Sequence, residues 1–357
     1  MGRKGKIFLI TWAILMTLIA GGIVGLEFLR YFGKGSLETK SATTSPMLNQ
    51  APVVDDTEMI TATPTQKWED DWVRYDGSIY DYNEDITTFL IMGIDKKDEV
   101  VKEQLEGTNG GQADALFLLV INPRDESVKI IGINRNSMTN VDVYDEYGRY
   151  QTTVKAQICT QHGFGNGMEE SCSYQVKAVS SMFYQLPIHG YAAINMSAIP
   201  IINDMVGGVD VTVLEDLTKA DKKLVKGEKV HLEGDMALTY VRSRDMKVFG
   251  SSDRRLERQR QYLNGFIGAA RKASEGGKNA AVEIFSSIND KMVTDITVDE
   301  VSYLAPLITK YSFDTSDFRM INGKTVKNGE FEEFEVDEDD LYKTIIEIFY
   351  EKVDNVG

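Results

Sequence analysis

The chain has 357 residues, 42% of them hydrophobic, and a formal net charge of −16 at pH 7. This composition is ordinary for a globular fold and excludes a globally disordered chain. The negative charge argues against a general nucleic-acid-binding protein, because contacts with phosphates normally need a basic surface.

The first predicted element is a transmembrane helix over residues 7–26, a run without any charged residue. At about 1.5 Å of rise per residue, such a helix spans the hydrocarbon core of a bilayer, which is roughly 30 Å thick. Basic residues lie on both sides, so the positive-inside rule favours only slightly a cytoplasmic N-terminus (residues 1–6), with the rest outside the cell membrane. The alternative is a cleaved signal peptide, but the apolar run is long for one and no small-residue cleavage pattern follows it.

Residues 27–66 are predicted to form an extracytoplasmic linker. From residue 33 onward, Ser, Thr, Pro and Gly are frequent and aromatic residues are few, which is typical of an unfolded spacer. A folded domain over residues 67–272 is expected next, because aromatic and polar residues alternate from about Trp68. Asp76 and Gly77 lie between two strand-like runs, as the turn of a β-hairpin does.

Strands and helices alternate within this domain. Buried strands are predicted at 87–95 and within 114–135, where a turn at 122–126 separates two of them. One helix is predicted at 172–186, and a second in a segment that ends at 207–208, before a strand. A short helix is predicted just before residue 242, and a long one at 254–273. The tail, 273–357, repeats this pattern and is predicted to be an α/β extension packed on the same domain. The predicted fold is therefore an α/β sandwich.

An arginine-rich stretch from Arg242 to Arg260 stands out in the acidic chain. It holds seven basic and three acidic residues, a local charge of 7 − 3 = +4, which leaves −16 − 4 = −20 for the rest. Guanidinium groups meet phosphate oxygens two at a time, so the stretch is a candidate anion site. The alternative is a solvated helix whose arginines pair with its own acidic residues.

Two aspartates stand at predicted strand ends: Asp95 closes the first buried strand and Asp114 opens the next. Ligands of α/β sheets bind in the crevice at strand ends. Carboxylate oxygens suit Mg²⁺, which links a protein to substrate phosphates. Taken singly, each aspartate also fits a cap or turn, which is the commoner role of such residues.

The two cysteines, Cys159 and Cys172, flank a glycine-rich loop that contains His162. Outside the cell membrane this pair is able to close a disulfide. The alternatives are two free thiols or a zinc site that includes His162, although three ligands in one loop fall short of a standard tetrahedral site.

Five segments between Tyr75 and Lys272 occur in an order that points to one family. They are YDGSIYDYNEDITTFLIMGID, ADALFLLVINPRDESVKIIGINRNS, HGYAAINMSAIPIINDMVGGVDV, the pattern L-x-G-x-x-AL-x-YVRSR, and RRLERQRQYL. Together, behind one N-terminal anchor, they make the chain similar to the LytR-CpsA-Psr family of cell-wall glycopolymer ligases. The resemblance covers nearly the whole predicted ectodomain and implies a mixed central sheet sandwiched by helices.

The resemblance also implies an activity. Enzymes of this family move a glycopolymer, such as teichoic acid or capsular polysaccharide, from a polyprenyl-pyrophosphate carrier to peptidoglycan, with Mg²⁺ on the pyrophosphate. By motif, Asp95 and Asp114 match the metal-associated carboxylates, and either is a candidate base for the sugar hydroxyl. The motif residues expected to hold the pyrophosphate are Arg135, which is also placed in catalysis, and Arg242, Arg244, Arg255, Arg258 and Gln259.

The sequence departs from the family pattern beside these residues. Where the family commonly has R-S-D-T, residues 112–115 read QADA, which removes an arginine. Gln157 replaces a basic residue, and Ser252 replaces an aspartate, with Asp253 one position later. Two alternatives to transfer stay open: a non-catalytic protein that binds polyprenyl pyrophosphate or the cell wall, and a polyprenyl-pyrophosphate phosphatase. A transcriptional role, a label this family has carried, is disfavoured because a domain outside the membrane does not reach DNA.

Overall fold

The computed structural model of the chain describes residues 27–40, 45–48, 72–97, 99–101, 110–245, 247–275 and 280–353. The predicted transmembrane helix at 7–26 and its orientation lie outside these residues. Within the described ranges, every helix is too short or too polar to cross a membrane.

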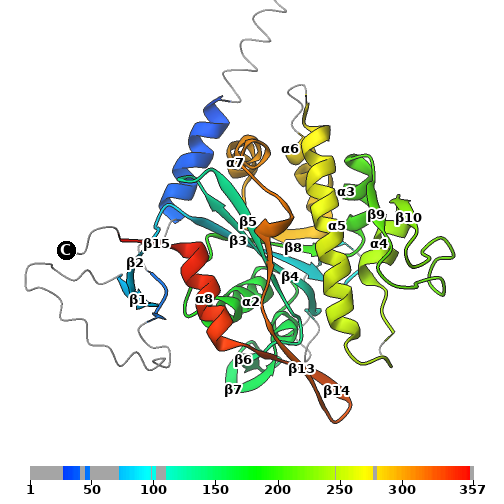
Figure 1. Cartoon of the computed structure of the whole chain (residues 1–357), viewed down its shortest axis with the longest axis horizontal. Helices are drawn as coiled ribbons and strands as arrows, with labels where there is room; N and C mark the ends of the chain where they lie inside the picture. Colours follow the sequence, from blue (N-terminus) through cyan, green and yellow to red (C-terminus); the bar gives the residue numbers. More distant parts are fainter. Residues whose placement is uncertain are drawn as a thin grey trace, which may run out of the picture.

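A six-stranded mixed sheet forms the centre of the molecule (Figure 1). Its strand order is β11-β8-β3-β4-β5-β12; β8 runs parallel to β3 and β12 runs parallel to β5, while the other neighbours are antiparallel. The bounds of its strands are β3 (Thr87–Ile94), β4 (Ala113–Asn122), β5 (Ser127–Ile133), β8 (Gly190–Asn195), β11 (Met292–Thr294) and β12 (Phe318–Met320). The predicted mixed α/β fold is confirmed, and the tail after residue 273 supplies both outer strands of the sheet.

Helices cover both faces of this sheet. Successive residues of each strand point to opposite faces, so each strand contributes side chains to both layers of helices. Leu90 and Met92 of β3 pack in a core with α2 and α8, whereas Phe89 and Ile91 pack on the side of α3, α5, α6 and α7. The helix bounds are α2 (Glu169–Met182), α3 (Ala198–Met205), α4 (Asp235–Arg242), α5 (Ser251–Ala273), α6 (Ala280–Ser287), α7 (Val298–Lys310) and α8 (Glu338–Phe349).

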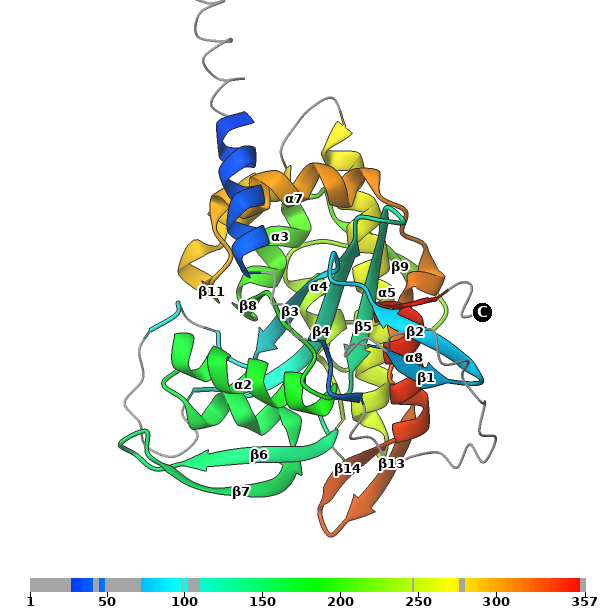
Figure 2. The ribbon, with the colours of Figure 1, turned by 90° about the vertical axis from the view of Figure 1, so that its left-hand side faces the viewer.

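Among the described residues, four smaller sheets surround the central one. The predicted hairpin is present, and Asp76 and Gly77 both have positive φ angles, of 47° and 69°, as a tight hairpin turn requires. Two further hairpins, β6–β7 and β13–β14, extend from the same end of the molecule (Figures 1 and 2). The bounds are β1 (Val73–Tyr75), β2 (Ser78–Tyr82) and β15 (Tyr350–Lys352); β6 (Met138–Tyr144) and β7 (Tyr150–Gln157); β9 (Val209–Thr212) and β10 (Lys229–Leu232); β13 (Gly323–Asn328) and β14 (Phe331–Val336).

The prediction of an unfolded spacer from residue 33 onward is wrong for residues 33–40, which belong to a helix over residues 27–40 packed on α7. Leu37 is 4% exposed and belongs to a core cluster with Phe89 and Ile121. The backbone at Gly33 meets that of Asp299, where a side chain has no room. The Ser, Thr and Gly content of this segment concealed these few packing residues. The rest of the predicted linker lies outside the described residues, apart from residues 45–48.

Candidate functional site

Three predicted site residues meet at one edge of the central sheet. Asp95 follows β3, Asp114 is the second residue of β4, and Arg135 comes two residues after β5. The β3–β4 register shifts at this point, since Gly93 pairs with Ala115 while Ile94 pairs with Ala113. Asp114 therefore has no partner opposite it, which is the mark of a β-bulge, a device that redirects a side chain at a functional edge.

Asp114 lies between two guanidinium groups. Its Oδ1 is 2.7 Å from Nη1 of Arg135, and its Oδ2 is 2.9 Å from Nη1 of Arg255, a residue of α5. Arg255 also donates through Nη2 to the carbonyl oxygen of Asp114 at 3.3 Å. The side chains of Arg135, Arg255 and Asp114 are 9%, 4% and 14% exposed, so this arrangement is shielded from solvent.

A third arginine, Arg244, belongs to the same charge cluster. It is half-buried, and its Nη1 donates to Oγ of Ser252 at 2.8 Å. Burial, followed by the charge of Arg135, lowers the pKa of Arg244. Burial likewise lowers the pKa of Arg255 to about 10, against the opposing effect of Asp114, which leaves this guanidinium charged at neutral pH. Arg135 and Arg255 thus share the carboxylate of Asp114, and Arg244 lies close enough to interact electrostatically with both Arg135 and Asp114. Such a group of guanidiniums favours the binding of an anion.

Asp95 is the open carboxylate of the site. Its side chain is exposed, Oδ1 accepts a hydrogen bond from the backbone N–H of Gln112 at 2.7 Å, and Oδ2 has no partner among the described residues. Asp95 therefore fits Mg²⁺, which commonly uses one or two carboxylates together with substrate phosphates. Oδ2 of Asp114 accepts a hydrogen bond from Arg255, and the buried Oδ1 contacts Arg135 as an ion pair without a hydrogen bond. A metal ion at Asp114 would therefore displace one of these arginines. No group of three or more acidic, His or Cys side chains suited to a metal occurs in the described part of the chain.

The structure places Arg258 and Gln259 away from this cluster, which corrects their predicted role. The Arg258 side chain is 0% exposed; its Nε donates to Glu215 at 2.7 Å, and its two other nitrogens donate to the carbonyls of Tyr240 and Ser243. Gln259 donates to the carbonyl of Val241 at 3.2 Å. Both residues hold α5 against the end of α4 and, in the described part of the chain, form no hydrogen bond or ion pair with Asp114, Arg135 or Arg244. Arg242 is exposed and has no recorded partner among the described residues, so its predicted role stays a prediction.

We expect Arg258→Ala to lower the free energy of unfolding by about 3–5 kcal/mol, because it leaves Glu215 and two carbonyls without their buried cation. Arg260 is the matched control: it lies two positions along α5, is 38% exposed and pairs with Glu257. Arg260→Ala should change stability by less than about 1 kcal/mol. Urea unfolding of both variants measures this, and equal losses would contradict the structural role of Arg258.

The predicted disulfide is also wrong, since Cys159 and Cys172 are buried free thiols. Each sulfur faces a different partner. Sγ of Cys159 accepts from Nη2 of Arg135 at 2.8 Å, whereas Sγ of Cys172 lies 3.9 Å from Nε2 of His162. Burial raises the pKa of Cys172, so this thiol stays protonated at neutral pH. Of the alternatives, two free thiols is the one observed, and Cys159 adds a soft acceptor that orients Arg135.

His162 supports the loop beside Asp95, because its Nδ1 lies 3.0 Å from the carbonyl of Gly111. Burial lowers the pKa of His162 to about 4, and burial does the same to His189. Both imidazoles are therefore neutral in the folded chain but take up a proton on unfolding below about pH 6.5, the unperturbed value. This contribution to stability is fully present above about pH 6.5 and is lost as the pH falls toward 4.

We expect the free energy of unfolding to fall by about 3 kcal/mol per buried histidine between pH 6.5 and 4, on the scale of 1.36 kcal/mol per pKa unit. His162→Asn should flatten this dependence. His231→Asn is the comparison: His231 is exposed and its hydrogen bond to Asp210 raises its pKa, so removing this imidazole should not flatten the dependence. Urea unfolding across this pH range measures the effect, and an unchanged slope in His162→Asn would contradict it.

The C-terminal hairpin also supports the site, a contribution that sequence reasoning missed. Oδ1 of Asp253 accepts from Asn134 at 2.6 Å, and its Oδ2 accepts from Thr325 of β13 at 2.7 Å. Glu332 of β14 accepts from the backbone N–H of Gly250, just before α5, at 2.6 Å. The only sequence signal was the displaced acidic residue Asp253, because no motif marks Thr325 or Glu332.

Comparisons with known proteins define the class. The model of the LytR_cpsA_psr family matches residues 53–347, and the chain belongs to this family. A Bacillus cereus protein named polyisoprenyl-teichoic acid–peptidoglycan teichoic acid transferase TagU is 28% identical over 214 residues, which cover 60% of this chain and 62% of that protein. The chain thus spans about three fifths of the length of this curated relative.

Solved structures share the fold. B. subtilis TagV is 24% identical with a TM-score of 0.56, over 73% of this chain and 96% of that one. A TagT structure described as bound to LIIa-WTA is 21% identical with a TM-score of 0.54, over 74% of this chain and 89% of that one.

Proposed function

We propose that the chain transfers an anionic glycopolymer or capsular polysaccharide from a polyprenyl-pyrophosphate carrier to peptidoglycan, at the outer side of the cell membrane. The observation that carries this proposal is the cluster of Arg135, Arg244 and Arg255 around one carboxylate. A pyrophosphate diester carries two negative charges, and guanidinium groups bind phosphate oxygens in charge-assisted hydrogen bonds. Family membership and the names of the relatives support transfer to peptidoglycan.

The reaction is a displacement at phosphorus. A sugar hydroxyl of peptidoglycan attacks the phosphorus next to the glycan, the bridging P–O bond breaks, and polyprenyl phosphate leaves. Negative charge grows on the leaving oxygen and on the oxygens of the attacked phosphorus. Arg135, Arg244 and Arg255 are fixed in place before the reaction, so they stabilise this charge without reorganising. Mg²⁺, when bound, neutralises further charge on the pyrophosphate, and Asp95 would hold it.

The proton of the attacking hydroxyl needs an acceptor. Asp95 has an unpartnered oxygen, whereas Asp114 must first release an arginine. The same oxygen of Asp95 serves Mg²⁺ or the proton, because a carboxylate that binds the metal is a poor base.

Asp95→Asn separates these roles. If Asp95 holds Mg²⁺, we expect the Mg²⁺ concentration for half-maximal transfer to rise about tenfold, with activity recovering at high Mg²⁺, as loss of one carboxylate ligand predicts. If Asp95 is the base, kcat should fall at every Mg²⁺ concentration and the acidic limb of the pH profile should disappear. Full activity at low Mg²⁺ would exclude both roles.

The test of the function itself uses the full chain with Mg²⁺, a polyprenyl-pyrophosphate glycan and peptidoglycan oligomers, and follows attached glycan by mass spectrometry. Acceptor-dependent attachment supports transfer. Donor binding without any product would instead support the binding-protein alternative, and release of phosphate independent of the acceptor would support the phosphatase alternative.

A further inference from the structure

The helix over residues 27–40 is fixed to the domain on one side. Gly33 lets its backbone touch α7: a Cβ at this position would lie 2.1 Å from the carbonyl oxygen of Asp299. Lys40 pairs at 3.0 Å with Glu300, a fully buried carboxylate that also accepts from Ser36 at 2.7 Å. With Leu37 in the core cluster, these contacts dock the helix as a rigid part of the fold.

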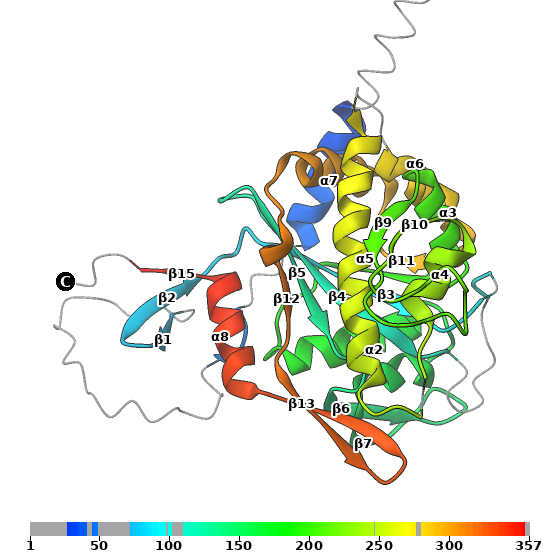
Figure 3. The ribbon, with the colours of Figure 1, turned by 45° about the vertical axis from the view of Figure 1, so that its right-hand side comes forward.

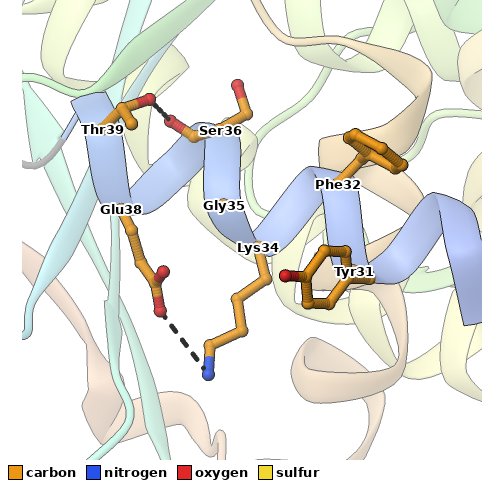
Figure 4. A pocket seen from close by; sticks show the side chains of 7 residues that line it. All are labelled: Tyr31, Phe32, Lys34, Gly35, Ser36, Glu38 and Thr39. Carbon is orange, nitrogen blue, oxygen red and sulfur yellow. Dashed lines mark hydrogen bonds and ion pairs between the residues drawn. The ribbon is translucent and has the colours of Figure 1, made fainter.

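The opposite side of this helix is aromatic and exposed. Phe28, Tyr31 and Phe32 are 61%, 75% and 51% exposed. Tyr31 and Phe32 line a surface hollow of about 500 Å³, and its lining residues within the described part of the chain come from this helix (Figure 4). The exposed charges pair within the helix, Arg30 with Glu27 at 2.8 Å and Lys34 with Glu38 at 3.5 Å, so the aromatic side carries no net charge.

The chain itself indicates what covers this surface. The uncharged run at 7–26 ends one residue before the described helix begins. Tyr residues next to such a run gather at the membrane–water interface, and Phe residues on the apolar face of an interfacial helix are buried at the boundary of headgroups and acyl chains. We propose that Phe28, Tyr31 and Phe32 lie in the headgroup region of the bilayer, and that the docked helix thereby holds the arginine site on the side of the domain that faces away from the membrane. This inference rests on the proposed location at the membrane.

The orientation follows from the sheet. Leu37 belongs to one core cluster with Phe89, Ile121 and Val128 at the start of β5, and these three strand residues lie at the end of the sheet opposite Asp95 and Asp114. From Ile121 to Asp114 along β4, seven residues at about 3.3 Å each span roughly 23 Å. In Figures 1 to 3 the helix over residues 27–40, drawn in blue, lies toward the top of the molecule. The start of α5 and the hairpins β6–β7 and β13–β14 lie at the lower end. The pyrophosphate must therefore be lifted well clear of the bilayer to reach the arginines.

Site-directed spin labelling of the full chain in phosphatidylcholine nanodiscs tests this placement. Tyr31→Cys and Phe32→Cys carry the label at the proposed interface, and Phe331→Cys, which is 71% exposed on the β13–β14 hairpin, carries it at the distal end. Wild-type chain treated in the same way gives the background, since both native cysteines are buried. We expect the labels at 31 and 32 to collide with oxygen but to be shielded from a water-soluble nickel complex, and the label at 331 to be open to nickel.

Equal nickel access at 31 and 331 would overturn the interfacial placement, and shielding at 331 would overturn the orientation. A chain that does not incorporate into nanodiscs would overturn the membrane location as well. If the chain transfers glycan but the labels at 31 and 32 are open to nickel, the interfacial placement is wrong while the proposed function stands. The two proposals therefore fail separately.

Two glycine variants test the rigid docking. Gly33→Val should displace the helix, because the added side chain collides with the backbone of α7. The spin label at 32 would then move more freely, and its electron paramagnetic resonance spectrum should narrow. Gly35→Val is the matched control on the same helix, where a Cβ would meet no atom within 4 Å. The same spectrum in both variants would contradict the docking.

Discussion

Replacing Asp114 with alanine is expected to destabilise the chain by about 3 kcal/mol, and added inorganic pyrophosphate should restore part of this loss. The substitution leaves Arg135 and Arg255 buried without their shared carboxylate, and breaking a buried ion pair on one side typically costs about 3–5 kcal/mol. The same change makes the three arginines a stronger anion site. At a pyrophosphate concentration of about 100 times its Kd, binding would contribute about 2.7 kcal/mol.

Thermal unfolding with and without pyrophosphate measures both effects. The shift caused by pyrophosphate should be larger in Asp114→Ala than in the wild-type chain, because the carboxylate no longer competes with the ligand. Asp216→Ala is the control, since Asp216 is exposed and bonds only to Thr218. A pyrophosphate shift in Asp114→Ala that is no larger than in wild type would show that the arginine cluster is not an anion site.

The sequence predicted the elements of the fold well, because local patterns determine them. The long helix α5 has its apolar residues at helical spacing, and Leu256 and Leu263 pack on the sheet as expected. Gly207 and Gly208, with φ angles of 84° and 82°, end α3 before β9, as the pair of glycines predicted. Such signals depend on neighbours within a few residues.

The partners of individual site residues could not be predicted in this way. Arg255 and Arg258 are three positions apart on α5 and look alike in sequence. One meets Asp114, 141 residues away, and the other meets the carbonyl of Tyr240, 18 residues away. The cysteine spacing allowed a disulfide, but Arg135 and His162 occupy the two sulfurs. Long-range packing, which the fold alone determines, decides each of these cases.

This division of roles along α5 leads to the prediction with the largest expected effect on activity. Arg255→Ala should lower kcat for glycan transfer by about 10²–10³, the loss typical of removing one fixed donor from the charge developed in a transition state. Arg255→Lys should recover only part of the activity, because an ammonium group does not bind two oxygens in a fork. The rate of acceptor-dependent glycan attachment at saturating donor is the measurement.

Arg254 provides the control for this experiment. It precedes Arg255 on the same helix but is 43% exposed and pairs with Glu215 at 3.2 Å, outside the cluster around Asp114. Arg254→Ala should keep kcat within about twofold of wild type, because an exposed pair contributes little. If both alanine variants lost activity equally while remaining folded, the general positive charge of α5 would suffice to explain the donor interaction. If only Arg255→Ala lost it, the catalytic charge would be assigned to the group that meets Asp114 at the sheet edge.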